Sequence, residues 1–342
     1  MIKVSFKVQD VVKKLLSSLS ERSFDIIVKR YGLGKDTKKM TLEAIGGQYG
    51  ITRERVRQIE EQSLSTIRKS DAYKEGEVIF NEIMGVIDDL GGVVSESELL
   101  ENLSKVEGVK NKFQFILVVG APFEKFKEDD QFLHRWAIDT ELASSVENSI
   151  KELYKNLGDE EIMQESELIK IFLNYLADVS SKYRDEAILK RWLNMSKKIS
   201  QNPLGEWGKS ESPNINVKGV RDYAYLVIRK HGSPIHFKEL AEQISTIFNR
   251  KAHVATCHNE LIKDSRFVLV GRGLYALADW GYAPGVVRDV ISNILEKNGP
   301  LTKEEIIQKV LKERYVKENT VIVNLQNNKL FKKTKEGKYT LA

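Results

Sequence analysis

Charged and amide side chains gather at the start of one predicted helix, just after Thr52 in this chain of 342 residues. Arginine can donate two hydrogen bonds to guanine, glutamine can pair with adenine in the same way, and a glutamate oxygen can accept from cytosine. Arg53, Glu54 and Gln58 therefore supply the side-chain types that distinguish base pairs in the major groove.

A preceding short helix and a tight turn are predicted to position this segment. Thr41 is a suitable N-cap, and Leu42, Ile45 and Tyr49 place apolar side chains on one face of the first helix. Gly50 then provides a turn position that tolerates a positive φ angle. The spacing predicts two helices joined by a short turn.

The second helix is predicted to begin after Thr52, which is again a suitable N-cap. Its buried stripe is expected to consist of Val56, Ile59, Leu64 and Ile67. This is a helix-turn-helix arrangement, in which the N-terminal residues of the second helix meet base edges in the major groove. The alternative is a helical hairpin whose arginines form only a solvated face.

These segments resemble region 4 of bacterial housekeeping sigma factors over about residues 10–70. The resemblance is carried by Thr52–Glu60, which is similar to the family's recognition helix, and by Leu19–Leu33, which is similar to its preceding helix. The chain departs from the family at Glu61 and the three polar residues Gln62, Ser65 and Thr66, where the family is usually more basic.

The resemblance implies contacts with the upstream hexamer of a promoter and with RNA polymerase core. Arg53, Glu54 and Gln58 would contact bases, Arg30 and Arg57 would hold phosphates, and the first helices would dock on the polymerase. The full set of predicted DNA-binding residues is Arg53, Glu54, Gln58, Arg57, Arg30, Thr52 and Arg55.

Composition and charge are typical of a globular protein with a basic N-terminal part. Apolar residues make up 41% of the chain and charged residues 30%, and no apolar run approaches the roughly 18 residues of a membrane span. The single cysteine excludes an internal disulfide and favours a reducing cytoplasm. Residues 1–74 hold 16 Lys and Arg against nine Asp and Glu, whereas the remainder has a net charge of −2. The basic surplus therefore lies with the predicted helix-turn-helix, as phosphate binding requires.

Beyond residue 75 a pattern of about 65–75 residues recurs four times. Each repeat is predicted to contain three helices followed by a β-hairpin, and the clearest hairpin is Phe267–Leu277. Three helices and a hairpin form the winged-helix plan, in which the hairpin covers the open side of a small core. The first helices of the four repeats are predicted at Val78–Leu90, Val146–Leu157, Val220–Lys230 and Val286–Lys297.

Residues 217–282 are similar to the HARE-type helix-turn-helix domain, a family that occurs in the delta subunit of RNA polymerase, in chromatin proteins and beside nuclease domains. The similarity rests on the segment that begins at Val220 and on the hairpin that ends at Trp280. It implies a module associated with nucleic acid or with polymerase, and it leaves protein contact and DNA contact as equal alternatives.

No residue pattern indicates enzymatic chemistry, a metal site or a cofactor. The five histidines and Cys257 show no metal-ligand spacing with a partner in reach, and no phosphate-binding glycine loop occurs. His253, Cys257 and His258 are expected to face core and solvent on one helix. The four tryptophans are expected to pack as hairpin anchors rather than to stack on bases.

The sequence thus predicts a mainly α protein with a sigma region 4-like helix-turn-helix and tandem winged-helix units. We expect a cytoplasmic, nucleoid-associated, non-enzymatic transcription factor that binds promoter-like double-stranded DNA and RNA polymerase core, without a membrane. The alternatives are a polymerase-binding adaptor without selective DNA binding, and a DNA-targeting subunit of a restriction or modification system. The predicted domains are 1–74 (helix-turn-helix), 75–142 (winged-helix-like), 143–216 (divergent winged-helix-like), 217–282 (HARE-type) and 283–342 (C-terminal winged helix).

Overall fold

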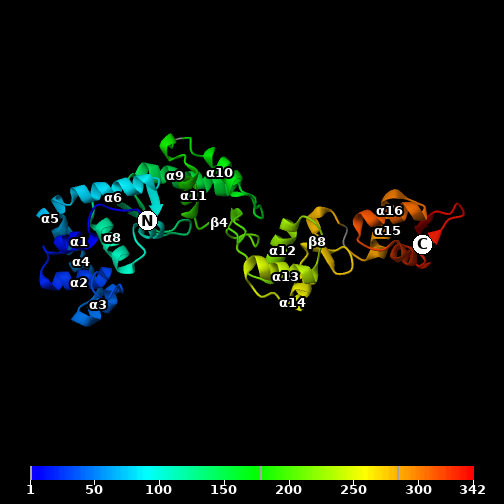
Figure 1. Cartoon of the computed structure of the whole chain (residues 1–342), viewed down its shortest axis with the longest axis horizontal. Coiled ribbons are helices and arrows are strands. Elements are labelled where there is room, and N and C mark those ends of the chain that lie inside the picture. Colours follow the sequence, from blue (N-terminus) through cyan, green and yellow to red (C-terminus); the bar gives the residue numbers. More distant parts are fainter. Residues whose placement is uncertain (1, 178, 283–284) are drawn as a thin grey trace. The chain divides into compact units, whose positions relative to one another are not determined.

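The computed structural model describes residues 2–177, 179–282 and 285–342 (Figure 1). The chain divides into two compact units: unit 1 comprises Met1–Ser200 and Trp207–Ser210, and unit 2 comprises Gln201–Glu206 and Glu211–Ala342. Most regular elements are helices, and the strands are short, which confirms the predicted mainly α class. Within the described ranges no helix is both long and apolar enough to cross a bilayer.

The elements follow one another as alternating groups of helices and short strands. Those that lie wholly or mostly in unit 1 are α1 (Val8–Leu16), α2 (Glu21–Tyr31), α3 (Leu42–Tyr49), α4 (Arg53–Arg68), α5 (Asp71–Lys74), α6 (Glu77–Asp89), β1 (Val93–Ser95), α7 (Glu96–Leu103), α8 (Glu107–Val119), β2 (Glu124–Phe126), β3 (Arg135–Ala137), α9 (Thr140–Asn156), α10 (Glu165–Leu173), η1 (Ser181–Tyr183), α11 (Glu186–Asn194), β4 (Ile199–Gln201) and β5 (Trp207–Lys209). Those of unit 2 are α12 (Val220–His231), β6 (Ile235–His236), α13 (Phe237–Phe248), α14 (Val254–Lys263), β7 (Phe267–Leu269), β8 (Leu274–Leu277), η2 (Ala278–Trp280), α15 (Val287–Asn298), α16 (Lys303–Glu313), α17 (Glu318–Leu325), β9 (Phe331–Lys333) and β10 (Tyr339–Leu341).

The helix-turn-helix of α3 and α4 has the predicted caps and turn. The Thr41 hydroxyl accepts a hydrogen bond from the Ala44 N–H at 3.1 Å, and Thr52 accepts one from the Arg55 N–H at 3.2 Å. Gly50 ends α3 with φ of 63°, the left-handed conformation that glycine adopts without strain. These local interactions fix where α4 begins and therefore which side chains stand at its N-terminus.

Two separate packing faces hold the N-terminal helices. Ile26, Ile45 and Val56 form a small core between α2, α3 and α4, and each is fully buried. A larger core brings α1, α2 and the end of α4 against α8, which contributes Phe115 and Ile116. This larger core crosses the predicted domain boundary at residue 74, so the helix-turn-helix and the following repeat share their apolar interior.

Buried polar contacts reinforce the packing of α8. The Asn111 side chain is 1% exposed and donates hydrogen bonds to the carbonyl oxygens of Gly32 at 3.1 Å and Thr37 at 2.8 Å. Arg68, the last residue of α4, donates to the carbonyls of Val118 and Val119 at the end of α8. A guanidinium at a helix C-terminus satisfies carbonyls that have no partner within the helix.

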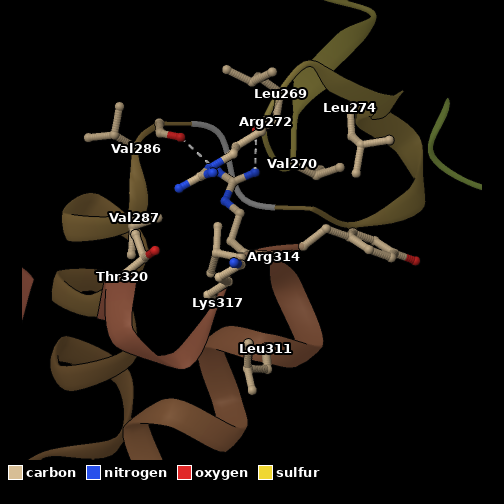
Figure 2. Close-up of a pocket in the computed structure, with 14 residues that line it drawn as sticks. Leu269, Val270, Arg272, Leu274, Val286, Val287, Leu311, Arg314, Lys317 and Thr320 are labelled. Carbon is tan, nitrogen blue, oxygen red and sulfur yellow. Dashed lines mark hydrogen bonds between the residues drawn. The ribbon is translucent and has the colours of Figure 1, made fainter. Parts of the chain in front are cut away.

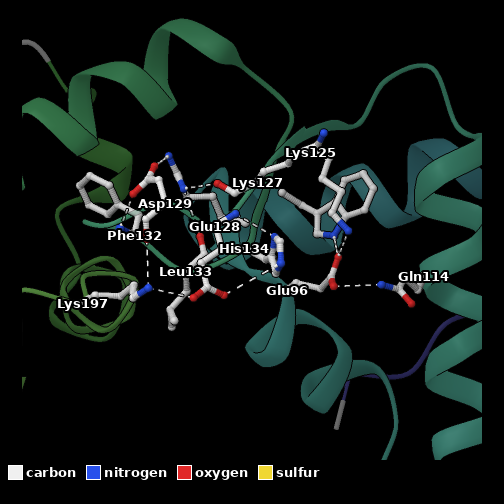
Figure 3. Close-up of polar contacts among 12 residues, drawn as sticks. Glu96, Gln114, Lys125, Lys127, Glu128, Asp129, Phe132, Leu133, His134 and Lys197 are labelled. Carbon is white, nitrogen blue, oxygen red and sulfur yellow. Dashed lines mark hydrogen bonds and ion pairs between the residues drawn. The ribbon is translucent and has the colours of Figure 1, made fainter. Parts of the chain in front are cut away.

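An acidic side chain and a tryptophan form the same contact in the first two predicted repeats. In the first, the Glu96 carboxylate accepts a hydrogen bond from the Trp136 indole at 2.8 Å. Glu96 also pairs with Lys125 at 2.7 Å, and Figure 3 labels both of these residues. In the second, Glu165 accepts from the Trp207 indole at 3.1 Å. Each glutamate is the first residue of its helix, where the helix dipole also favours negative charge.

The burial of Glu96 and of the tryptophans bears on two questions: the charge of the glutamate, and whether the tryptophans pack in the core or are free to stack on bases. Burial would raise the pKa of Glu96, but Lys125 and the Trp136 indole together hold it below its usual value. Trp136, Trp192 and Trp207 are at most 1% exposed, so all three pack inside the protein. Trp136 and Trp207 lie in strands, as predicted for hairpin anchors, but Trp192 lies in α11, so the prediction of a hairpin anchor is wrong for Trp192. Trp280 is half-buried and packs against the core of unit 2.

Unit 2 contains two successive groups of three helices and a hairpin, each with its own apolar core. In the first group β6, β8 and β7 form a three-stranded sheet, with Tyr275 opposite both Ile235 and Leu269. The helices and hairpins predicted here are present. The winged-helix and HARE-type assignments remain predictions, and the predicted boundary at residue 283 lies outside the described residues.

Candidate nucleic-acid interface

The first two turns of α4 present the predicted base-reading side chains to solvent within unit 1. The side chain of Arg53 is 68% exposed, that of Glu54 is 59% exposed, and Gln58 is also exposed. Val56 lies between them in the sequence but is fully buried against α2 and α3. The buried stripe of α4 therefore turns the polar edge outward.

Arg53 is held only loosely by another side chain. Its Nη1 lies 3.7 Å from a carboxylate oxygen of Glu43, which is 69% exposed. Exposed ion pairs of this kind contribute about 0–1 kcal/mol, because solvent screens both charges. Another hydrogen-bond acceptor can therefore replace Glu43 as the partner of Arg53 at little cost.

Gln58 and Arg55 contact each other one turn further along α4. The Arg55 guanidinium donates a hydrogen bond from Nη1 to Oε1 of Gln58 at 3.1 Å. An adenine needs both the amide oxygen and the amide nitrogen of a glutamine. In this structure the Gln58 amide oxygen is therefore already engaged by Arg55.

Arg57 is flanked by two carboxylates on the same helix. It donates to Glu54 at 2.6 and 2.9 Å and also pairs with Glu61, four residues further on. The hydrogen bond from Arg57 lowers the pKa of Glu54, and the two glutamates raise the pKa of Arg57. Glu54 and Arg57, predicted to contact cytosine and phosphate, therefore neutralise each other in this structure.

Arg30 has a different environment from the other predicted phosphate contact. Its side chain is 35% exposed, donates to the Met40 carbonyl at 3.2 Å and lies 3.4 Å from Glu60 of α4. The Tyr31 hydroxyl donates to the same carboxylate at 2.8 Å, and burial raises the pKa of Tyr31. Arg30 thus links α2, the segment before α3, and α4, while part of its side chain remains accessible.

Sequence reasoning did not identify Glu61 as a part of this interface. The signal was present, because Arg57 and Glu61 stand at positions i and i+4, where side chains on a helix meet. The seven predicted residues all lie on α4, its N-cap or the adjoining α2. Elsewhere in the described ranges, no group of three or more His, Cys, Asp and Glu side chains is arranged to hold a metal ion.

The fold and the exposed edge of α4 define a sigma region 4-like helix-turn-helix module. Residues 15–69 match the family model for region 4 of sigma-70 factors. The RNA polymerase sigma factor RpoS of Coxiella burnetii is 43% identical over 60 residues, which are 18% of this chain and 17% of that protein. The RNA polymerase sigma factor SigA of a Nostoc species is 47% identical over 57 residues, 17% of this chain and 14% of that protein. The chain therefore spans less than a fifth of the length of these two relatives, and the likeness is confined to the module.

Proposed function

We propose that the protein is a sequence-specific DNA-binding regulator of transcription initiation that acts with RNA polymerase and has no catalytic role of its own. The observation that carries this proposal is the exposed Arg53–Glu54–Gln58 edge at the N-terminus of α4. It lies in the segment that matches sigma region 4, and the two sigma factors similar to it support a role in transcription.

The N-terminus of α4 is proposed to enter the major groove. Arg53 donates to guanine there, and Gln58 pairs with adenine after its amide leaves Arg55. The basic surplus of residues 1–74 supports attraction to the phosphate backbone. Arg30 and Arg57 are the proposed phosphate contacts, and Arg57 must exchange a carboxylate for a phosphate to serve as one.

The packing of α8 restricts how RNA polymerase can meet the first helices. The apolar faces of α1 and α2 already contact α8 in the larger core of unit 1. A polymerase surface that docks here is therefore proposed to use exposed residues of α1 and α2, such as Lys13 and Phe24, the latter 42% exposed.

Selection from random duplexes tests the proposal directly. The full chain is used to enrich DNA sequences, and affinity is then measured by fluorescence anisotropy on the selected duplex and on each single base-pair variant of it. We expect Arg53→Ala to weaken binding to the selected duplex by about 5- to 150-fold and to abolish discrimination at one base pair. The control Lys13→Ala removes an exposed charge on α1 and should preserve discrimination at every position. Failure to enrich any sequence would contradict selective binding.

A second candidate function is that of a polymerase-binding adaptor, and a cavity in unit 2 favours it. The cavity has a volume of about 720 Å³ and lies between the β7–β8 hairpin and the last group of helices (Figure 2). Leu269, Val286 and Tyr315 line it and are between 46% and 54% exposed. Arg314 supports the cavity, since it is 3% exposed and donates to the carbonyls of Leu269 and Gly285. Co-purification with polymerase that survives nuclease treatment, without enrichment of any DNA sequence, would favour the adaptor.

A further inference from the structure

A second cavity lies in unit 1 and is formed by elements other than the helix-turn-helix. It has a volume of about 360 Å³ and lies between α9, the loop before β3 and the segment that follows α11. This size is within the range of small-molecule sites, which begins near 300 Å³.

The floor of the cavity is apolar and firmly held. Phe132 is 2% exposed and Ile150 is 1% exposed, while Tyr154 is half-buried at the side. The Phe132 N–H donates to Asp129 at 2.7 Å (Figure 3). The guanidinium of Arg135 lies 4.9 Å from the centre of the Phe132 ring. The floor is therefore preformed and does not depend on a ligand for its shape.

The residues that line the wall of the cavity include more lysines than acidic residues. Lys151, Lys155 and Lys198 line it together with a single acidic residue, Glu152, which pairs with Lys155 at 2.6 Å. Gln131 and Ser196 also line the cavity with an amide and a hydroxyl. This combination of donors suits an anionic ligand.

Among the residues that line the cavity, Lys151 is the one best placed to bind an anion. It is half-buried, and its ammonium lies 5.6 Å from the centre of the Phe132 ring. Among the residues that the structure describes, no carboxylate lies within ion-pair distance of Lys151. An aromatic ring compensates only part of the cost of removing an ammonium from water, so a bound anion would stabilise this arrangement.

We propose that this cavity binds a phosphate monoester attached to an aromatic body, the chemistry of a nucleoside monophosphate. The phosphate would be held by Lys151 with help from Lys198, and the base would lie against Ile150 and Tyr154. Lysine binds phosphate as a point charge, and the apolar floor accepts a planar ring without requiring one particular base. Two sources share this chemistry: a free mononucleotide and the 5′-phosphorylated end of a nucleic acid strand.

Isothermal titration calorimetry on the full chain tests the site with separated parts of the ligand. The complete ligands tested are AMP, GMP, CMP and UMP. Inorganic phosphate represents the phosphate group alone, and adenosine represents the nucleoside alone. We expect at least one mononucleotide to bind about tenfold more tightly than either part, because the charged and apolar contacts act together. A short oligonucleotide with a 5′-phosphate is compared with its 5′-hydroxyl form and with the mononucleotides. If the 5′-phosphorylated oligonucleotide binds most tightly, the ligand is a strand end; if a mononucleotide does, it is a free nucleotide. Either result supports the site.

Matched variants show whether binding occurs in this cavity. Lys151→Met keeps the length of the side chain and should weaken binding about tenfold, whereas Lys170→Met, an exposed charge change on α10, should have no effect. Asn148→Trp places a large ring in the cavity from an exposed position on α9 and should abolish binding without changing charge. Arg53→Ala should leave binding intact, which separates this site from DNA recognition by α4.

Three results would overturn the proposal. The first is that no phosphate monoester binds. The second is that inorganic phosphate binds as tightly as the nucleotides, which would show that the apolar floor takes no part. The third is that Lys151→Met and Lys170→Met weaken binding equally, which would reduce the effect to net charge.

Discussion

Replacement of Glu61 by glutamine should increase the affinity of the protein for DNA. In the structure Arg57 pairs with Glu54 and with Glu61, so its charge is balanced before any phosphate approaches. Both glutamates are well exposed, at 59% and 61%. Glu61→Gln removes one competitor for Arg57 and one negative charge near the phosphate backbone, while glutamine keeps the length of the side chain and its helix propensity.

The expected size of the effect follows from the exposure of the Arg57–Glu61 pair. Solvent screens such pairs, so release of Arg57 from one of two carboxylates should tighten binding by only about two- to fivefold at 0.1 M salt. The salt dependence is the sharper signal. Each additional phosphate contact changes the slope of log affinity against log salt by about −0.9, and Glu61→Gln should make the slope steeper by up to this amount.

Fluorescence anisotropy of the full chain on a selected duplex, at several salt concentrations from about 50 to 200 mM, measures both quantities. The matched control is Glu167→Gln, an exposed glutamate on α10 that changes net charge equally. Weaker binding by Glu61→Gln, or an effect equal to that of Glu167→Gln, would refute the idea that Glu61 restrains Arg57.

Three further predictions concern stability and reactivity. Thr52→Ala should lower the free energy of unfolding by about 1 kcal/mol in urea titration, because the N-cap bond to the Arg55 N–H is lost; an unchanged midpoint would contradict the cap. Asn111→Ala should lower it by about 1–3 kcal/mol, because the buried Gly32 carbonyl and the partly buried Thr37 carbonyl lose their donor. A loss below about 0.5 kcal/mol, the size of an ordinary surface substitution, would show that water replaces the amide. Burial raises the pKa of the Cys257 thiol to about 11, so at pH 8 a disulfide reagent should modify the unfolded chain but not the native one, since only the thiolate reacts; equal rates would contradict the burial.

The helix-turn-helix could be predicted because its signals are local. Thr41 and Thr52 cap helices three residues from their bonding partners, and Gly50 has the positive φ that its place in the turn requires. The buried residue Val56 follows from helical periodicity within one short segment. Interactions over three or four residues are visible in the sequence whatever the tertiary structure is.

The shared core of unit 1 could not be predicted in this way. Helix α8 carries the nearly continuous apolar run Phe113–Val119 and is buried on several faces. Because its apolar residues are not confined to one face, the sequence does not indicate which helices pack against it. Its contacts with α1 and α2 join residues that are about a hundred positions apart in the sequence. The hydrogen bonds from Asn111 to the loop after α2 could not be predicted either. An asparagine within a helix does not indicate which distant carbonyl groups its side chain will contact.

The third strands of the sheets were also missed. β1 has three residues and β6 has two, so neither offers an alternating pattern long enough to predict a strand. Each forms because it pairs with a strand of the later hairpin, with Val94 opposite Trp136 and Ile235 opposite Tyr275. The exposed polar side chains at the start of α4 were predicted, but their pairing with one another was not.

A double-mutant cycle between Arg53 and a modified guanine tests the central claim most directly. In the selected duplex the guanine assigned to Arg53 is replaced by 7-deazaguanine, which lacks the N7 acceptor in the major groove, or by inosine, which lacks only the minor-groove amino group. We predict that 7-deazaguanine weakens binding by the normal chain and has little further effect on Arg53→Ala, while inosine leaves both affinities almost unchanged. Fully additive losses, or a larger effect of inosine than of 7-deazaguanine, would contradict major-groove reading by α4.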